Sequence, residues 1–280
     1  MSTPRHRSGP RRRERTGPRG QGPTTGLLWG LNAVEAALEA QRRTLRGLQL
    51  RSGADSDKLT HLRTLARGLG LPVQERAGAE LEVLTHGGHH QGAVLECGPL
   101  PLLDEHAALA LGAWQPPEPE ASAPPPPLLV ALDQVEDPRN LGAVVRSGAA
   151  FGAAGLVVPR DHSAPLSTVA ATASAGALER FPVYEVANLA RFLEQAKRHG
   201  FWVAGTGAEG GEPLAGYTHD RPLVLVLGNE GRGLRPLVAR SCDLLLTIPL
   251  PGRGIGPAAP ESLNVSAAAA VLLYHLMTYR

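Results

Sequence analysis

The stretch "VLGNEGRGL" at residues 226–234 joins the end of an apolar run to a glycine-rich turn. The whole run, "PLVLVL", has the length and composition of a strand that is covered on both faces. Gly228, Gly231 and Gly233 remove side chains from the turn, so a ligand could approach the main chain closely. Glu230 adds one carboxylate to the same turn. The stretch predicts either a ligand site at the end of a buried strand or a tight turn with a surface acid.

Similar apolar runs recur in residues 128–280, and each is followed by a pattern with helical spacing. Short apolar strands that alternate with helices predict a mostly parallel sheet with both faces covered. Ligands of such sheets bind beyond the carboxyl ends of the strands. The runs are PLLVALDQV, AGLVVP, FPVYEV, FWVAGTG, PLVLVLGNE and DLLLTIPL.

Residues 26–100 read as a separate, small α/β module. Helical spacing covers 29–41 and 58–70, and the strand candidates are LRGLQLR, LPVQER and GAVLECG. Residues 101–127 are predicted to be a linker, because "QPPEPEASAPPPP" within them is rich in proline and cannot build a core.

Charge is unevenly distributed along the 280 residues, whose net charge is only +2. Residues 1–25 hold seven arginines and one glutamate, which predicts a disordered tail that either binds a polyanion such as RNA or only aids solubility. The two cysteines, Cys97 and Cys242, allow no disulfide framework and no cysteine-based zinc site. No run is long and apolar enough to span a membrane. We expect a cytoplasmic protein, with the mitochondrial matrix as the alternative because an arginine-rich start also suits a transit peptide.

Two motifs are weaker than they look. "GTGAEG" (205–210) matches a dinucleotide fingerprint, but Pro213 and Gly216 stand where the required helix should run. We therefore do not expect a nicotinamide or flavin enzyme.

"HGGHH" (86–90) could suggest a metal, but no cysteine or carboxylate nearby completes a ligand set, and we expect no metal site.

Polar residues also mark the segment "LDQVEDPRNLGAVVRSGAAFG" (132–152). Asn140 stands where a helix N-cap is expected, and Arg146 lies off the apolar stripe of the helix that follows. Taken alone, they could be an ordinary capping residue and a solvated cation.

The last segment, "ESLNVSAAAAVLLYHLMTYR" (261–280), predicts a C-terminal helix that Ser262 could cap. Its four alanines permit close helix packing, either within the fold or across a dimer. A plain helix does not explain the polar residues before it, Asn264 among them.

Taken together, "DPRNLGAVVRSGAAFG", "LVLGNEGRGL" and "IPL…ESLNVS" stand in the order, and near the spacing, of the three motifs of the SpoU/TrmH-type (SPOUT) RNA ribose 2′-O-methyltransferases, which the chain resembles. "WGLNAVEAAL" and "HHQGAVLE" resemble the two ends of the substrate-binding module of the RlmB branch. The resemblance covers about residues 27–100 and 128–278.

This resemblance implies an α/β protein with a trefoil-knotted parallel-sheet domain at the C-terminus and a small N-terminal RNA-binding α/β domain. Knots are rare among folds, and periodicity alone would not suggest one. The resemblance also implies a homodimer packed through the knot domain, and S-adenosylmethionine as the methyl donor. The sulfonium supplies the leaving group, so no metal is required.

The resemblance assigns roles to individual residues. Arg146 would act on the ribose hydroxyl, either as general base or by gripping the neighbouring phosphate, and Asn140 would orient the ribose or Arg146. Glu230 would fix Asn140 or Arg146 by a charge-assisted hydrogen bond. The cofactor pocket would be lined by Thr206, Gly207, Gly228, Ile248 and Leu263. The catalytic set would be Arg146, Asn140, Glu230, Ser262 and Asn264. The insert at 251–261 is about twice the family's usual length, and it could cover the cofactor or touch RNA.

The implied substrate is a ribose, expected to be that of a guanosine, in large-subunit rRNA. Two alternatives use the same chemistry, on transfer RNA or on an rRNA site whose methylation blocks an antibiotic. A third alternative is a non-catalytic RNA-binding or ribosome-assembly protein.

Overall fold

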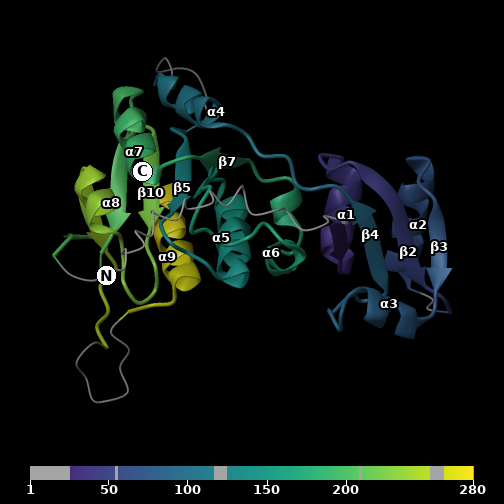
Figure 1. Cartoon of the computed structure of the whole chain (residues 1–280). Coiled ribbons are helices and arrows are strands. Elements are labelled where there is room, and N and C mark those ends of the chain that lie inside the picture. The colour runs from purple at the N-terminus through teal and green to yellow at the C-terminus, as the bar shows by residue number, and fades with distance from the viewer. Residues whose placement is uncertain (1–25, 54–55, 117–124, 208–209, 253–261, 280) are drawn as a thin grey trace, which may run out of the picture.

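Two β-sheets, one in each half of the chain, organise the fold (Figure 1). The structure is a computed structural model, and it describes residues 26–53, 56–116, 125–207, 210–252 and 262–279. The predicted arginine-rich tail, residues 1–25, and residues 253–261 of the predicted insert lie outside this description.

Within the described residues, the N-terminal sheet has four strands in the order β1-β4-β2-β3. They are β1 (Gly26–Trp29), β2 (Leu45–Arg51), β3 (Val73–Arg76) and β4 (Ala93–Cys97). The helices of this module are α1 (Leu31–Ala40), α2 (Asp57–Gly68) and α3 (Gly78–Leu84). The predicted helices at 29–41 and 58–70 and the three predicted strands are confirmed.

The C-terminal sheet has seven described strands in the order β7-β6-β5-β10-β8-β11-β9, and every pairing is parallel. The strands are β5 (Leu128–Leu132), β6 (Gly155–Pro159), β7 (Val183–Val186), β8 (Trp202–Thr206), β9 (Glu212–Pro213), β10 (Leu223–Leu227) and β11 (Leu244–Thr247). The helices are α5 (Pro138–Phe151), α6 (Thr168–Ala173), α7 (Leu189–Arg198), α8 (Pro236–Ser241) and α9 (Val265–Thr278). The predicted parallel sheet is confirmed.

Both faces of this sheet are buried, which is why its strands read as continuous apolar runs. Leu128, Val130 and Leu132 of β5 pack in one core with α5 and α9, whereas Leu129 and Ala131 pack in a second core with α7. The chain leaves β5 outward to β6 and β7 and returns to β8 on the other side of β10. The sheet therefore reverses its order beside β5 and β10, where doubly wound sheets bind ligands.

Helix α4 (Glu105–Ala110) and a short 3₁₀ helix, η1 (Leu111–Ala113), lie inside the segment 101–127 that the sequence predicts to be a linker. Just before them, Leu103 pairs with the edge of β7: its amide donates to Val183 at 2.9 Å and its carbonyl accepts from Glu185 at 2.8 Å. Leu103, near the start of this segment, is therefore bonded to the edge of the C-terminal sheet.

Candidate functional site

The turn after β10 brings two stretches of backbone into contact. A Cβ atom added to Gly228 would lie 2.4 Å from the carbonyl carbon of Gly233, so the turn admits no side chain at residue 228. Asn229 and Gly233 exchange both of their backbone hydrogen bonds, at 3.0 and 2.8 Å. The glycine that the sequence singles out is therefore required by the packing of the turn on itself.

Asn229 holds this turn together with its side chain. Its Oδ1 accepts from the amides of Gly231 at 3.0 Å and Arg232 at 3.3 Å, and its Nδ2 donates to the carbonyl of Gln134 at 2.9 Å. The last bond ties the turn to the loop after β5. The sequence analysis missed this residue, although an asparagine two residues before a glycine is a recognisable turn signal.

Asp133 makes a second tie between the same two loops. It is fully buried at the end of β5, and its carboxylate accepts from the amide of Arg235 at 2.7 Å and from Nε of Arg235 at 2.6 Å. A buried charge requires such a partner. The signal for Asp133 in the sequence is an acid directly after a fully apolar strand.

Asn140, Glu230 and Asn264 form one polar cluster, although they come from three distant segments. Oε1 of Glu230 accepts from Nδ2 of Asn140 at 2.6 Å and from Nδ2 of Asn264. Nδ2 of Asn264 also lies 3.2 Å from Oδ1 of Asn140. Three of the five predicted catalytic residues are therefore in direct contact.

The helices place this cluster differently from the prediction. Asp137 caps α5 by accepting from the amide of Arg139 at 2.8 Å, and Pro138 opens the helix. Asn140 therefore lies inside the first turn, where its side chain is free to reach Glu230. At the start of α9 the cap is Asn264 rather than the predicted Ser262. Proline suits the first position of a helix, which the prediction overlooked.

A cavity of about 470 Å³ lies beside the cluster, between the ends of β8, β10 and β11 and the start of α9. This volume is in the range of small-molecule sites. All five predicted cofactor residues line it, together with two of the predicted catalytic residues. These residues are Thr206, Gly207, Gly228, Ile248, Leu263, Glu230 and Ser262.

Three predicted catalytic residues, Arg146, Asn140 and Asn264, are not among the residues that line this cavity, and Arg146 lies exposed on α5. At 1.5 Å per residue it follows Asn140 by about 9 Å along the helix axis. Among the described residues it makes no ion pair or hydrogen bond, so its guanidinium is available to a ligand. Arg232, which the sequence analysis did not select, does line the cavity.

Neither cysteine is suited to act as a nucleophile. Burial raises the pKa of Cys97 to about 11 and the pKa of Cys242 to about 12. The thiolate is the reactive form, and at neutral pH both groups remain thiols.

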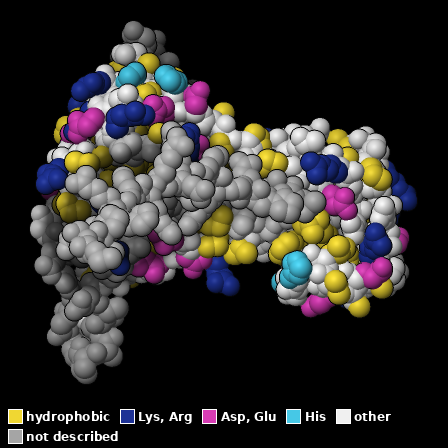
Figure 2. Space-filling model, in the orientation of Figure 1, with side chains coloured by type: hydrophobic (Ala, Val, Ile, Leu, Met, Phe, Trp, Pro, Cys, Tyr) yellow, Lys and Arg dark blue, Asp and Glu magenta, His cyan; other side chains and the backbone are white. Residues whose placement is uncertain are grey.

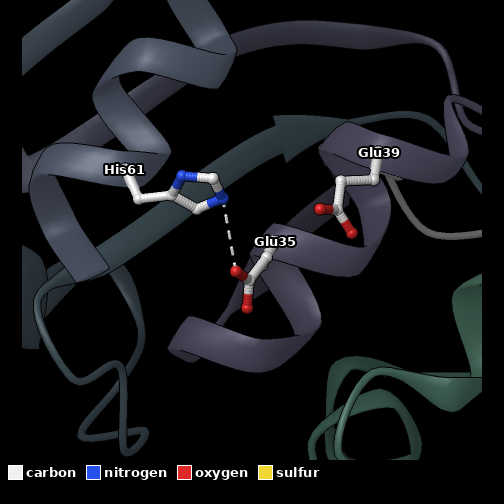
Figure 3. A group of neighbouring side chains, drawn as sticks. All are labelled: Glu35, Glu39 and His61. Carbon is white, nitrogen blue, oxygen red and sulfur yellow. Dashed lines mark ion pairs between the residues drawn. The ribbon is translucent and has the colours of Figure 1, made fainter. Parts of the chain in front are cut away.

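The "HGGHH" histidines form no three-ligand group within the described part of the chain. Nδ1 of His90 accepts from the amide of Gly92 at 3.0 Å. The group that does assemble is Glu35, Glu39 and His61 on the surface of the N-terminal module (Figure 3). Exposed acids often cluster without binding an ion, and both acids already face cations: Lys58 lies 3.6 Å from Glu35, and Arg180 pairs with Glu39.

Among the described residues that follow "GTG", no dinucleotide-binding helix is present. The described chain after Gly210 enters the short strand β9 instead, and Thr206 and Gly207 serve the cavity.

Comparisons with known proteins match both halves of the chain. A sequence model of the SpoU rRNA Methylase family matches residues 127–274, and one named RNA 2′-O ribose methyltransferase substrate binding matches residues 27–103. The 23S rRNA (guanosine-2′-O-)-methyltransferase RlmB of Pseudomonas aeruginosa is 36% identical over 90% of this chain and 96% of its own length. An uncharacterized tRNA/rRNA methyltransferase of Mycolicibacterium vanbaalenii is 38% identical over 91% of this chain and 77% of its own.

Solved structures share the fold. The SpoU methyltransferase AviRb from Streptomyces viridochromogenes, in complex with the cofactor AdoMet, aligns with a TM-score of 0.68. The alignment covers 90% of this chain and 88% of that one, at 24% identity.

Proposed function

Because the chain belongs to the SpoU rRNA methylase family, we propose that it transfers a methyl group from S-adenosylmethionine to the 2′-hydroxyl of a guanosine ribose in large-subunit rRNA. The observation that carries the proposal is the contact among Asn140, Glu230 and Asn264 at the edge of the cavity. Each comes from a different motif of the resemblance, and only the folded chain joins them.

The cavity suits an elongated, partly apolar nucleoside cofactor. Gly228 leaves main-chain atoms bare, while Ile248 and Leu263 offer apolar surface, and these residues would hold S-adenosylmethionine. When bound, the sulfonium supplies an activated methyl group and its own leaving group. The chain then has to align the ribose hydroxyl and exclude water.

The polar cluster can position the ribose. An asparagine amide has two N–H donors, and Asn140 gives one to Glu230, which leaves the other for a ribose oxygen. The carboxylate of Glu230 holds both asparagines in place through charge-assisted hydrogen bonds. Ser262 adds a hydroxyl to the same cavity.

We assign Arg146 to the phosphate and hydroxyl of the target nucleotide. A ribose seated at Asn140 leaves its phosphate within reach of an arginine farther along α5. A guanidinium has a pKa above about 12, which favours a phosphate grip that stabilises the developing alkoxide over a role as general base.

Transfer of labelled methyl groups from S-adenosylmethionine to rRNA tests this assignment. Removing one such group costs about a hundred-fold or more in rate, so Arg146→Ala should lose most of the activity. Arg198→Ala provides a matched control, because Arg198 is an exposed arginine on α7. Equal rates for the two variants would remove Arg146 from the mechanism.

The substrate alternatives are separated by mapping the methylated nucleotide. A relative named as a tRNA/rRNA methyltransferase keeps transfer RNA as a second candidate, and antibiotic-resistance methylation of rRNA is a third. A non-catalytic role in ribosome assembly predicts no heat of binding when S-adenosylmethionine is titrated into the protein.

We also infer a homodimer and a knotted C-terminal domain. Helix α9 lines the cavity with Val265, Ala268 and Leu272, yet exposes Val271 and Tyr274 on another face. An apolar face beside a binding site is suited to a second copy of the chain.

For RNA binding, the face seen in Figure 2 shows basic and acidic side chains interspersed over the described residues. The seven arginines of residues 1–25 would add long-range attraction to RNA. The described part of the chain has no helix long and apolar enough to cross a membrane. We propose the bacterial cytoplasm, where large-subunit rRNA is made, as the place of reaction; the mitochondrial matrix stays the alternative.

A further inference from the structure

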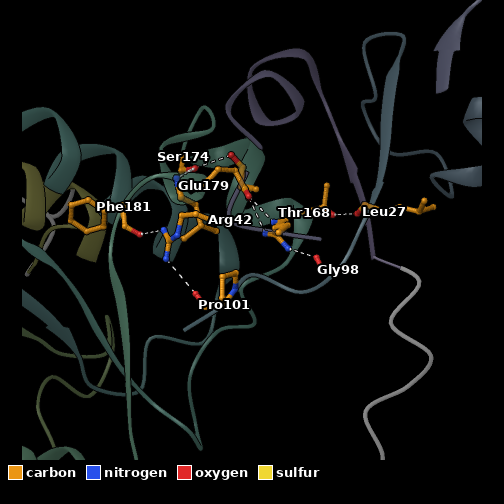
Figure 4. Close-up of polar contacts among 11 residues, drawn as sticks. Leu27, Arg42, Gly98, Pro101, Thr168, Ser174, Glu179 and Phe181 are labelled. Atoms are coloured by element: carbon orange, nitrogen blue, oxygen red, sulfur yellow. Dashed lines mark hydrogen bonds and ion pairs between the residues drawn. The ribbon is translucent and has the colours of Figure 1, made fainter. Parts of the chain in front are cut away.

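The N-terminal module is joined to the C-terminal domain by direct polar contacts as well as by the chain (Figure 4). On the C-terminal side, those made by described residues lie in the segment from α6 through η2 (Ala177–Glu179) to Phe181. The hydroxyl of Thr168 donates to the carbonyl of Leu27 at 2.5 Å, and that of Thr172 donates to the carbonyl of Trp29 at 3.3 Å. We call residues 168–181 the docking segment.

Arg43 and Glu179 form a buried ion pair across this boundary. Nε and Nη2 of Arg43 meet the two carboxylate oxygens at 2.6 and 2.8 Å, and the side chains are 7% and 1% exposed. Burial would lower the pKa of Arg43, but the hydrogen bond and charge of Glu179 outweigh it and raise that pKa above its ordinary value. The bidentate geometry fixes angle as well as distance.

Arg42 clamps the boundary beside this pair. Its Nη1 donates to the carbonyl of Phe181 at 2.9 Å, and its Nη2 donates to the carbonyl of Pro101 at 3.3 Å. It therefore holds the docking segment and the chain leaving the module at once.

The shapes of the two surfaces also match closely. A Cβ on Gly176 would lie 2.4 Å from the carbonyl oxygen of Asn32 and 2.9 Å from Cβ of Ala36, both in α1. Helix α1 can approach this closely only because residue 176 is a glycine. The N-terminal module therefore packs on the docking segment in one well-defined position.

The docking segment in turn packs against α5, the helix of Asn140 and Arg146. A Cβ on Gly142 would lie 2.4 Å from the carbonyl oxygen of Ala170. The ring of Phe181 packs on the same helix at Gly148, where an added Cβ atom would lie 3.0 Å from the ring. Phe181 thus contacts α5 with its ring and accepts from Arg42 with its carbonyl.

We propose that Arg42, Arg43 and Glu179 are positioning residues, which lock the N-terminal module to helix α5 so that RNA held by the module meets Asn140 and Arg146 at a set distance. The proposal rests on the proposed function, since it requires an RNA substrate that touches both domains. It also makes a claim that does not depend on activity, namely that the two domains keep one relative orientation in solution.

The experiment uses the full chain with spin labels on Arg67→Cys in α2 and Arg198→Cys in α7, two exposed positions in different domains. Pulsed electron resonance then gives the distribution of distances between the labels. The native chain should give one narrow distribution, and Glu179→Gln a broad one. Arg42→Ala should broaden it as well, and it leaves the buried pair intact, so it serves if Glu179→Gln does not fold. The double variant Arg43→Glu with Glu179→Arg restores the ion pair with its charges exchanged, and it should recover the narrow distribution of distances.

Methyl transfer to rRNA is measured on the same variants, with S-adenosylmethionine binding as the control. Misplaced reactants slow a reaction by about ten- to a hundred-fold, and we expect that loss with cofactor affinity unchanged. A narrow distribution in both variants would overturn the lock, and a broad one with native activity would overturn its role in positioning. Absence of methyl transfer by the native chain would instead refute the proposed function, while the distance distributions would still decide the lock.

Discussion

Glu230 is the residue on which the other polar side chains of the site converge. Both asparagine amides donate to the same carboxylate oxygen, although Glu230 itself is exposed. A hydrogen bond to a charged group contributes about 1.5–3 kcal/mol, more than a neutral one. Glu230 therefore sets the orientation of Asn140 and Asn264 without belonging to either of their helices.

Replacing Glu230 with Ala should release both asparagines from their orientation. We expect the turnover rate on rRNA to fall about ten- to a hundred-fold, as the loss of one or two charge-assisted bonds implies. The same substitution at Glu194, an exposed acid on α7, should leave the rate unchanged. Single-turnover kinetics measure the effect; a native rate for Glu230→Ala would show that the cluster does not act in the reaction.

The resemblance implied that Glu230 would bond either Asn140 or Arg146, but neither the choice between them nor the bond to Asn264 was predictable. Asn140 looks like a helix cap because it precedes an apolar stripe, yet Asp137 and Pro138 begin the helix earlier. An N-cap assignment uses only local chain geometry, whereas the partner of Asn140 lies ninety residues away. The bonds by which Asn229 and Asp133 join the two loops were not predictable either, because Gln134 and Arg235 lie 95 and 102 positions away.

At the scale of elements, the turn after β10 is the part of the fold that defines the cavity. Its backbone folds back on itself at Gly228 and Gly233, and Asn229 and Asp133 tie it to the loop after β5. The two loops therefore form one unit, with the cavity on one side and the polar cluster at its edge.

Two glycines of this turn make a matched test. Gly228→Ala should abolish cofactor binding and lower the free energy of unfolding by about 1–3 kcal/mol, because the new methyl group would overlap the backbone. Gly231→Ala should be tolerated, since its Cβ would meet no atom closer than 3.8 Å and its φ is not positive. Calorimetric titration and thermal unfolding measure both effects; identical behaviour of the two variants would show that the close contact does not shape the site.

At the scale of the whole molecule, helix α9 links the site to the predicted dimer. Val271 is 41% exposed and Tyr274 is 48% exposed. The ring of Tyr274 packs edge-on against that of Phe151, with 5.9 Å between the ring centroids. Large aromatic side chains on an apolar face are typical centres of protein interfaces. Another face of α9 lines the cavity, so dimer contact and cofactor binding share one helix.

We predict that the native chain sediments at twice its mass of 29.4 kDa and that Val271→Glu shifts it toward the monomer. A carboxylate in the centre of an interface should weaken association by about 2 kcal/mol or more. Val83→Glu is the control, because Val83 is 75% exposed on α3 of the N-terminal module. Analytical ultracentrifugation distinguishes the cases, and a dimer that persists in Val271→Glu would place the interface elsewhere.

The alternation of apolar runs and helical patterns by itself determined the parallel sheet, because a strand buried on both faces must be apolar throughout. The order of the three motifs determined the family, because each motif is a contiguous stretch of residues that can be recognised without knowing the fold. Only the tertiary structure decided that Glu230 bonds Asn140 rather than Arg146, that it also bonds Asn264, and that Arg43 pairs with Glu179. Those contacts join residues 34 to 136 positions apart, and their geometry depends on how strands and helices pack, which no local pattern specifies.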